Sequence, residues 1–277
     1  MPRPDRIFRT EGVILRRQDL GEADRILTLY TREHGKIKAL AKGARKPTSR
    51  KAGYVELFMR LDMLIARGHS LDILSQAEII DAYLPLRSDL VRAMYASHLG
   101  ELVDAFMEEG DENSLLYALL TSGLGWIASS DDLRRTARYF ELHFLDAVGF
   151  KPQLFRCVIS GEDVTAENQY FSAAEGGVIR PAYGHTRGGT RPISLNALKV
   201  LRYMQTRPIE VVDQLQLSPS VQDEIERLMH ETLTYHLERR LKSAAFLKRL
   251  RREAARQARE QGAEGDRDPE ADEDEAP

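Results

Sequence analysis

The stretch GKIKALAKGARKPTSRKAG, Gly35–Gly53, decides the fold at the amino end of the chain. Ile37, Ala39 and Ala41 alternate with polar or charged neighbours, apart from Leu40, and a period of two is the pattern of a half-buried β-strand. The strand runs directly into a loop that is dense in Lys and Arg. We therefore expect a strand whose outer face, together with the following loop, is strongly positive.

Four further runs around this stretch have the composition of strands, and turn-forming residues separate them. These runs are EGVILRR (11–17), ADRILTLYT (23–31), VELFMRLDMLIARG (55–68) and LDILSQAEI (71–79). In the last run, the predicted buried face holds Leu71, Ile73, Ala77 and Ile79. Five short strands can close into a small barrel without exposed edges, so we predict a five-stranded OB-type β-barrel.

From residue 86 onward the apolar period becomes helical, which predicts a mainly α-helical domain and an α+β chain overall. One predicted helix covers 130–149, with Ser130 or Asp131 as its N-cap and Gly149 at its end. Residues 150–193 interrupt the helices and are rich in Gly, Pro and turn formers. We expect a small β-hairpin insert there, with short strands at YFSA and GVIR.

Charge is unevenly distributed along the 277 residues, although the formal net charge is only −3. Residues 1–51 contain 14 Lys and Arg against 6 Asp and Glu, whereas the last residues are strongly acidic. A single cysteine excludes an internal disulfide, and no apolar run approaches the roughly 20 residues of a membrane helix. The start lacks the apolar centre of a secretory signal. These features predict a cytoplasmic protein with a basic binding domain and a disordered tail.

The basic residues of the predicted barrel form the candidate binding surface. Lys36, Lys38 and Lys42 point outward together if Ile37 and Ala39 face inward. Such a surface suits the phosphates of a nucleic acid, with little sequence preference. Tyr30, Tyr54 and Phe58 are candidates for base stacking, although each fits a core position at least as well. The predicted DNA-contacting residues are Arg16, Arg17, Arg25, Lys36, Lys38, Lys42, Arg45, Lys46, Arg50 and Lys51.

Catalytic and metal-binding patterns are lacking in the sequence. It has no HExxH and no GxSxG, and its histidines are scattered, so no enzyme class is indicated. Cys157 alone cannot hold zinc, because a structural site needs four Cys or His ligands. Two other classes stay open from the residues themselves. They are an RNA- or ribosome-binding OB protein and an interaction scaffold whose basic face is incidental.

Four stretches of the chain, in order, resemble the RecO family of bacterial recombination and repair mediators. They are GEADRILTLYTREHGKIKALAKGARKPTSR (21–50), LGELVDAF (99–106), RYFELHFLDAVGFKPQLFRCVISG (138–161) with YFSAAEGG (170–177), and LERRLKSAAFLKRL (237–250). From these patterns and the resemblance we expect an OB domain (1–82) and a helical domain (83–259) with a ribbon insert at about 150–193. The predicted acidic tail (260–277) lies outside the resemblance.

The same resemblance implies a non-enzymatic role in the RecF pathway. Such proteins bind single- and double-stranded DNA, anneal complementary strands, engage the single-stranded DNA-binding protein, and help RecR to load RecA; the resemblance also implies association with the nucleoid. Zinc-binding members have CxxC…CxxC in the ribbon, whereas this chain keeps only Cys157. Ser160, Arg180 and Tyr183 occupy the other three positions. We therefore expect no cofactor and a degenerate, metal-free zinc ribbon.

Overall fold

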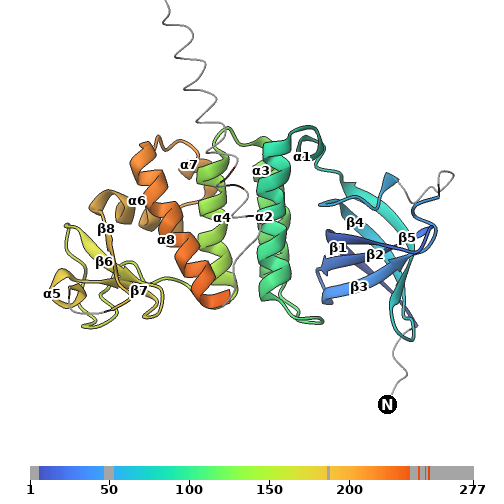
Figure 1. Cartoon of the computed structure of the whole chain (residues 1–277), viewed down its shortest axis with the longest axis horizontal. Helices are drawn as coiled ribbons and strands as arrows, with labels where there is room; N and C mark the ends of the chain where they lie inside the picture. Colours follow the sequence, from blue (N-terminus) through green and yellow to red (C-terminus); the bar gives the residue numbers. More distant parts are fainter. Residues whose placement is uncertain are drawn as a thin grey trace, which may run out of the picture.

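The computed structural model describes residues 6–46, 53–185 and 188–237 and the single positions 243, 247 and 249. A β-barrel lies at one end of the elongated molecule, a small β-sheet lies at the other, and helices fill the space between them (Figure 1). Among the described residues, no helix combines the length and the apolar composition that a bilayer crossing requires. The acidic tail predicted for 260–277 lies outside the described residues.

The barrel closes from five strands in the spatial order β1-β2-β3-β5-β4. All neighbouring strands are antiparallel except β3 and β5, which pair in parallel. This arrangement confirms the predicted OB-type barrel. The strands are β1 (Ile7–Leu20), β2 (Asp24–Thr31), β3 (Gly35–Ala41), β4 (Arg60–Ala66) and β5 (Asp72–Asp81).

The predicted inner face of β3 is confirmed, because Ala39 and Ala41 are fully buried and Ile37 packs against the same core. For the run 71–79 the prediction is confirmed only for Ala77, which packs against the barrel core. Leu74 is the fully buried residue there, and Ile79 is 50% exposed. A register shift opposite Leu64 and Ile65 marks a β-bulge, which puts Leu74 and Ala77, three positions apart, on the same inner side. A strict period of two cannot reveal a bulge.

The helical domain begins immediately after the barrel. Its helices are α1 (Pro85–Ser88), α2 (Leu90–Phe106), α3 (Ser114–Ser129), α4 (Leu133–Ala147), α6 (Leu195–Thr206), α7 (Ile209–Val212) and α8 (Pro219–Leu237). The cap of α4 is Asp132, which accepts from the Arg135 N–H, rather than Ser130 or Asp131. Gly149 follows the end of α4 with φ of +87°, as its sequence position predicts.

The insert between α4 and α6 contains a small sheet, as predicted. Its strands are β6 (Gln169–Ser172), β7 (Gly177–Ile179) and β8 (Arg191–Ile193), in the order β7-β6-β8. A short helix, α5 (Pro181–Gly184), follows β7. The sequence indicated the first two strands but not β8, which is only three residues long and contains a proline.

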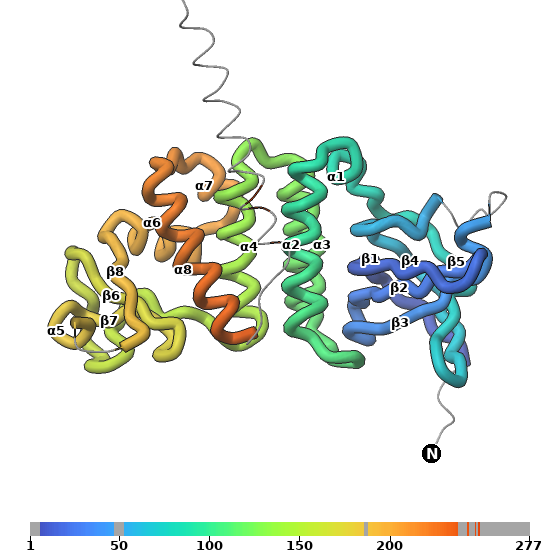
Figure 2. Tube along the Cα trace, in the orientation of Figure 1, coloured from blue at the N-terminus to red at the C-terminus, as the bar shows by residue number. Residues whose placement is uncertain are grey.

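Helix α2 lies next to the barrel, whereas α6 and α8 lie toward the small sheet (Figure 2). The barrel residues Val13, Leu15, Tyr30 and Phe58 are buried in one hydrophobic cluster with the helical domain. Gly100 permits close packing there, because a Cβ on it would lie 3.3 Å from the Phe58 ring. The barrel is therefore fixed against α2 by an apolar contact.

Candidate nucleic-acid interface

The basic residues that the sequence grouped together lie in two places on the barrel. One group, on the outer face of β1 and β3 near α2, comprises Arg16, Lys36 and Lys38. The other group, near the β1–β2 turn and the loop after β3, comprises Arg17, Arg25, Lys42, Arg45 and Lys46. Arg50 and Lys51 lie outside the described residues.

In the first group, each cation contacts a carboxylate from the helical domain. Arg16 Nη1 is 3.0 Å from Asp104 Oδ2, and Lys36 Nζ is 3.4 Å from Oδ1 of the same residue. Lys38 pairs with Glu109, in the loop after α2. The Lys36 side chain is only 13% exposed, whereas those of Arg16 and Lys38 are 66% and 48% exposed. Lys36 therefore joins the two domains, and the other two cations face solvent.

The backbone beside Lys36 explains why the loop after α2 stays against β3. The Gly110 N–H donates to the Lys36 carbonyl oxygen over 2.9 Å. Gly35 has φ of +59°, and a Cβ on it would lie 2.0 Å from the Asp111 carbonyl oxygen. Only glycine combines this backbone conformation with so close an approach. Gly35 thus positions Glu109 beside Lys38.

In the second group, two carboxylates hold three arginines. Glu56 pairs with Arg17 and lies 3.3 Å from Arg25. Asp19 lies 3.1 Å from Arg25 and 3.4 Å from Arg45. Arg25 is the least exposed of the three, so its main effect is to order the neighbouring side chains.

Lys42 and Lys46 are exposed and have no ion pair with any residue that the structure describes. The loop that presents them is tied down at two points. The Gly43 N–H donates to Asp24 Oδ1 over 2.7 Å, and the Arg45 guanidinium donates to the Gly21 carbonyl oxygen over 2.8 Å. The loop backbone is therefore held in place, and its two exposed lysines can contact an anion from solvent.

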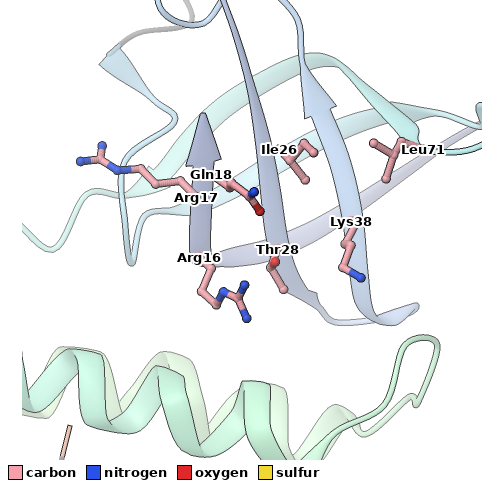
Figure 3. Close-up of a pocket in the computed structure, with 7 residues that line it drawn as sticks. All are labelled: Arg16, Arg17, Gln18, Ile26, Thr28, Lys38 and Leu71. Carbon is pink, nitrogen blue, oxygen red and sulfur yellow. The ribbon is translucent and has the colours of Figure 1, made fainter. Parts of the chain in front are cut away.

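The outer surface of β1, β2 and β3 contains a cavity of about 250 Å³ (Figure 3). Strand register places Arg16 opposite Thr28, and Thr28 opposite Lys38. In Figure 3, Arg16 points toward the helices, while the Arg17 side chain extends away from Lys38. The lining residues are Arg16, Arg17, Gln18, Ile26, Thr28, Lys38 and Leu71.

The aromatic residues considered for stacking are not placed to stack on bases. Tyr30 is fully buried between the barrel and the helices, and burial, with the nearby Asp111 charge, raises the pKa of its phenol. Phe58 is buried in the same cluster, and Tyr54 packs against the barrel core. Any contact with nucleic acid on this face therefore depends on charge and on aliphatic side chains.

Sequence reasoning missed the carboxylates Asp104 and Glu109 and the cavity residues Gln18, Ile26 and Thr28. Alternation along β2 could have placed Ile26 and Thr28 outside, because Leu27 and Leu29 face the barrel core. No local signal could have linked Asp104 to Arg16, which is 88 positions away. Glu22 and Asp24 lie just before Arg25 in the sequence, but Asp19 and Glu56 are its partners.

In the insert, the Cys157 Sγ is buried and accepts the Arg180 N–H over 3.4 Å. Burial raises the pKa of the Cys157 thiol, but hydrogen bonds from the Arg180 backbone N–H and from the side chain and backbone of Ser160 together outweigh burial, so the net shift of this pKa is downward. The Arg180 side chain pairs with Glu162, which also accepts from the Ser160 hydroxyl over 3.2 Å. Within the described ranges, no three His, Cys, Asp or Glu residues are grouped for a metal ion.

Comparison with known families follows the same division of the chain. The family model "Recombination protein O N terminal" matches residues 6–83, which include the barrel, and "Recombination protein O C terminal" matches residues 87–245. The chain belongs to the RecO family. The resemblance seen in the sequence is therefore confirmed over both parts.

Curated RecO relatives cover most of the chain. The DNA repair protein RecO of Roseiflexus sp. (strain RS-1) is 39% identical over 247 residues, which are 89% of this chain and 87% of that protein. The protein of the same name from Pelotomaculum thermopropionicum is 38% identical over 245 residues, 88% of this chain and 95% of that protein. The one from Symbiobacterium thermophilum is 36% identical over 248 residues.

Proposed function

We propose that this RecO-family chain is a DNA repair and recombination mediator that binds DNA through the barrel. Exposed cations at two places on the barrel, the outer face of β1 and β3 and the loop after β3, support this proposal. Lys42 and Lys46 face solvent without an ion pair to a described residue, and Arg16 and Lys38 are at least 48% exposed. Contacts of this kind bind any sequence, because they neutralise phosphates and release counterions.

Annealing follows from the same charge. Two complementary strands repel each other through their phosphates, and a cationic surface that binds both lowers this repulsion. In our proposal, residues 1–82 bind single- and double-stranded DNA, and residues 83–259 bind partner proteins. Those partners are RecR and the single-stranded DNA-binding protein, and RecA is loaded indirectly. The protein acts in the cytoplasm, at the nucleoid.

We further propose that the protein is not an enzyme and that the insert works without metal. The Arg180–Glu162 pair and the buried Cys157 lie together, where a zinc ribbon would have its ligands. A guanidinium that pairs with a carboxylate can hold two loops together as a metal ion does, although more weakly. Equal thermal stability with and without a strong chelator is the expected result.

The test of DNA binding is a salt titration with a charge-matched control. The triple variant Lys42→Ala, Arg45→Ala, Lys46→Ala removes three exposed cations from the barrel. The control, Lys151→Ala, Arg156→Ala, Lys199→Ala, removes three exposed cations from the insert and α6. Binding of a fluorescent single strand is measured by anisotropy over a range of salt concentrations, and annealing is measured in parallel.

The barrel variant should bind more weakly at low salt, with the slope of log K against log salt reduced by about two, at about 0.7 per phosphate contact. The control should match the unmodified protein. Equal affinity and slope for all three proteins, with intact folding by circular dichroism, would contradict DNA binding by the loop after β3. Tighter binding to RNA of the same length would instead favour an RNA-binding role.

A further inference from the structure

Two lysines of the barrel differ from the other cations around them. Two carboxylates from the helical domain and two from the barrel domain pair with the remaining cations of both groups. Lys42 and Lys46 are exposed, and neither forms an ion pair with a residue in the described ranges. Hydrogen bonds from Gly43 and Arg45 fix the loop that presents them. This loop therefore offers two cations to a partner that is rich in carboxylates.

The chain itself contains such a partner at its carboxyl end. Residues 264–277, EGDRDPEADEDEAP, hold eight Asp and Glu against one Arg, a formal net charge of −7. The match to the RecO family models ends at residue 245, so this acidic segment lies outside it. Opposite charges at contact distance attract even near water, and a run of carboxylates can contact both ammonium groups at once.

The chain approaches this segment from a position beside the barrel. The Ser243 N–H donates to Glu101 Oε2 over 2.8 Å, and Glu101 lies one turn before Asp104 on α2. Asp104 in turn contacts Lys36 of β3. Leu247 is buried in the hydrophobic cluster that the barrel shares with the helical domain. The last described part of the chain therefore lies near the junction of the two domains.

The length of the chain that follows permits a contact with the loop after β3. Fourteen residues lie between Arg249, the last described position, and Glu264. That length spans up to about 50 Å when extended, about twice the length of the 17-residue helix α2. A segment on such a tether has an effective concentration of about 1 mM. This concentration suffices for a contact between exposed charges, which is weak in isolation.

We propose that the acidic segment 264–277 binds Lys42 and Lys46 of its own chain and competes there with nucleic acid. The inference rests on the proposed DNA binding and adds an internal competitor to it. A strand that binds this loop must displace the acidic segment as well as small ions. Fewer counterions are then released, so the affinity depends less on salt than it would with a neutral segment.

The first test detects the contact without DNA. A carbodiimide joins a lysine to a carboxylate where the two touch, and mass spectrometry identifies the joined peptides in the monomeric product. We expect links from 264–275 to Lys42 or Lys46 at low salt, and their loss at about 1 M salt, where the Debye length is about 3 Å. Links from this segment only to other lysines, such as Lys151 or Lys199, would overturn the inference, as would their absence. Links that form only between an isotope-labelled and an unlabelled copy would exclude a contact within one chain.

The second test measures the competition on the full chain. The acidic end is neutralised by Glu270→Gln, Asp272→Asn, Glu273→Gln, Asp274→Asn and Glu275→Gln. Affinity for a single strand, measured by anisotropy, should rise about two- to fivefold at low salt, and its dependence on salt should become steeper. Combined with Lys42→Ala and Lys46→Ala, the same neutralisation should no longer raise the affinity, because the competed site is gone.

The comparison separates the contact from a general effect of charge. An equal gain with and without the two lysines would trace the gain to net charge and refute the competition. No gain in either background would refute it as well. If the crosslinks form but no variant binds DNA, the contact stands and the proposed DNA binding fails.

Discussion

The Lys36 ammonium and Asp104 join the barrel to α2. Lys36 Nζ donates to the Asp104 carbonyl oxygen over 2.7 Å and lies 3.4 Å from its Oδ1. Both side chains are less than one-fifth exposed. A cation that the sequence places with the DNA-contacting residues is therefore held at the domain junction, where it positions the exposed Arg16 and Lys38 relative to the helices.

Replacement of Asp104 by Asn should weaken the junction. The change leaves Lys36 shielded from water without its carboxylate, and a partner lost at such a site costs about 1–3 kcal/mol. Urea unfolding followed by circular dichroism measures the free energy of unfolding. The control is Asp163→Asn, which removes the partner of Arg156 in an exposed pair. Equal losses in the two variants would mean that the junction does not depend on this contact.

Gly35→Ala should be far more damaging than Gly21→Ala. Both glycines have nearly the same φ, +59° and +57°, so both variants lose about 1–2 kcal/mol of stability to backbone strain. Only at Gly35 does the new Cβ meet another segment, the Asp111 backbone, while open space surrounds Gly21. We expect a further loss of about 1–3 kcal/mol at Gly35, measured by thermal unfolding. Matching melting temperatures for the two variants would refute the close approach.

Glu109→Gln should strengthen DNA binding, because it releases Lys38 from its carboxylate partner. We expect a two- to fivefold gain in affinity for a single strand at low salt, and a smaller gain at high salt, where charges are screened. The adjacent Glu108→Gln makes the same change in net charge at an exposed residue that forms no ion pair with any cation the structure describes. A similar gain in both variants would point to net charge alone.

His143 should make stability depend on pH. Burial lowers the pKa of this imidazole below its ordinary 6.5, although the hydrogen bond to the Met204 carbonyl oxygen opposes the shift. The unfolded chain therefore takes up the proton first as the pH falls below 6.5. The stability contribution is complete above this value and is lost as the pH falls toward the folded-state pKa.

The readout is the difference in unfolding free energy between the unmodified protein and His143→Gln, measured from pH 7.5 to pH 5. The unmodified protein should lose more stability than the variant over the acid part of this range. Exposed His69→Gln is the control, and its curve should run parallel to that of the unmodified protein. A His143→Gln curve with the same slope as the unmodified protein would exclude the predicted linkage.

Much of the fold could be predicted because the signals are local. The alternation in β3 comes from a strand with one buried face, and Ala39 and Ala41 are indeed fully buried. The helices follow from apolar stripes with a period near 3.6. The prediction failed where geometry broke the period: the bulge in β5 turned Leu74, rather than Ile73, toward the core.

The sequence by itself determined a basic barrel followed by a helical domain with a small insert, since periodicity and charge density depend on neighbouring residues alone. Only the tertiary structure decided which of the barrel cations pair with carboxylates of the helical domain. Asp104 and Glu109 reach the barrel from α2 and the loop that follows it, and Leu71 reaches the cavity from the turn before β5. Contacts between positions so distant in the chain are set by how the domains pack, which leaves no periodic trace in either segment.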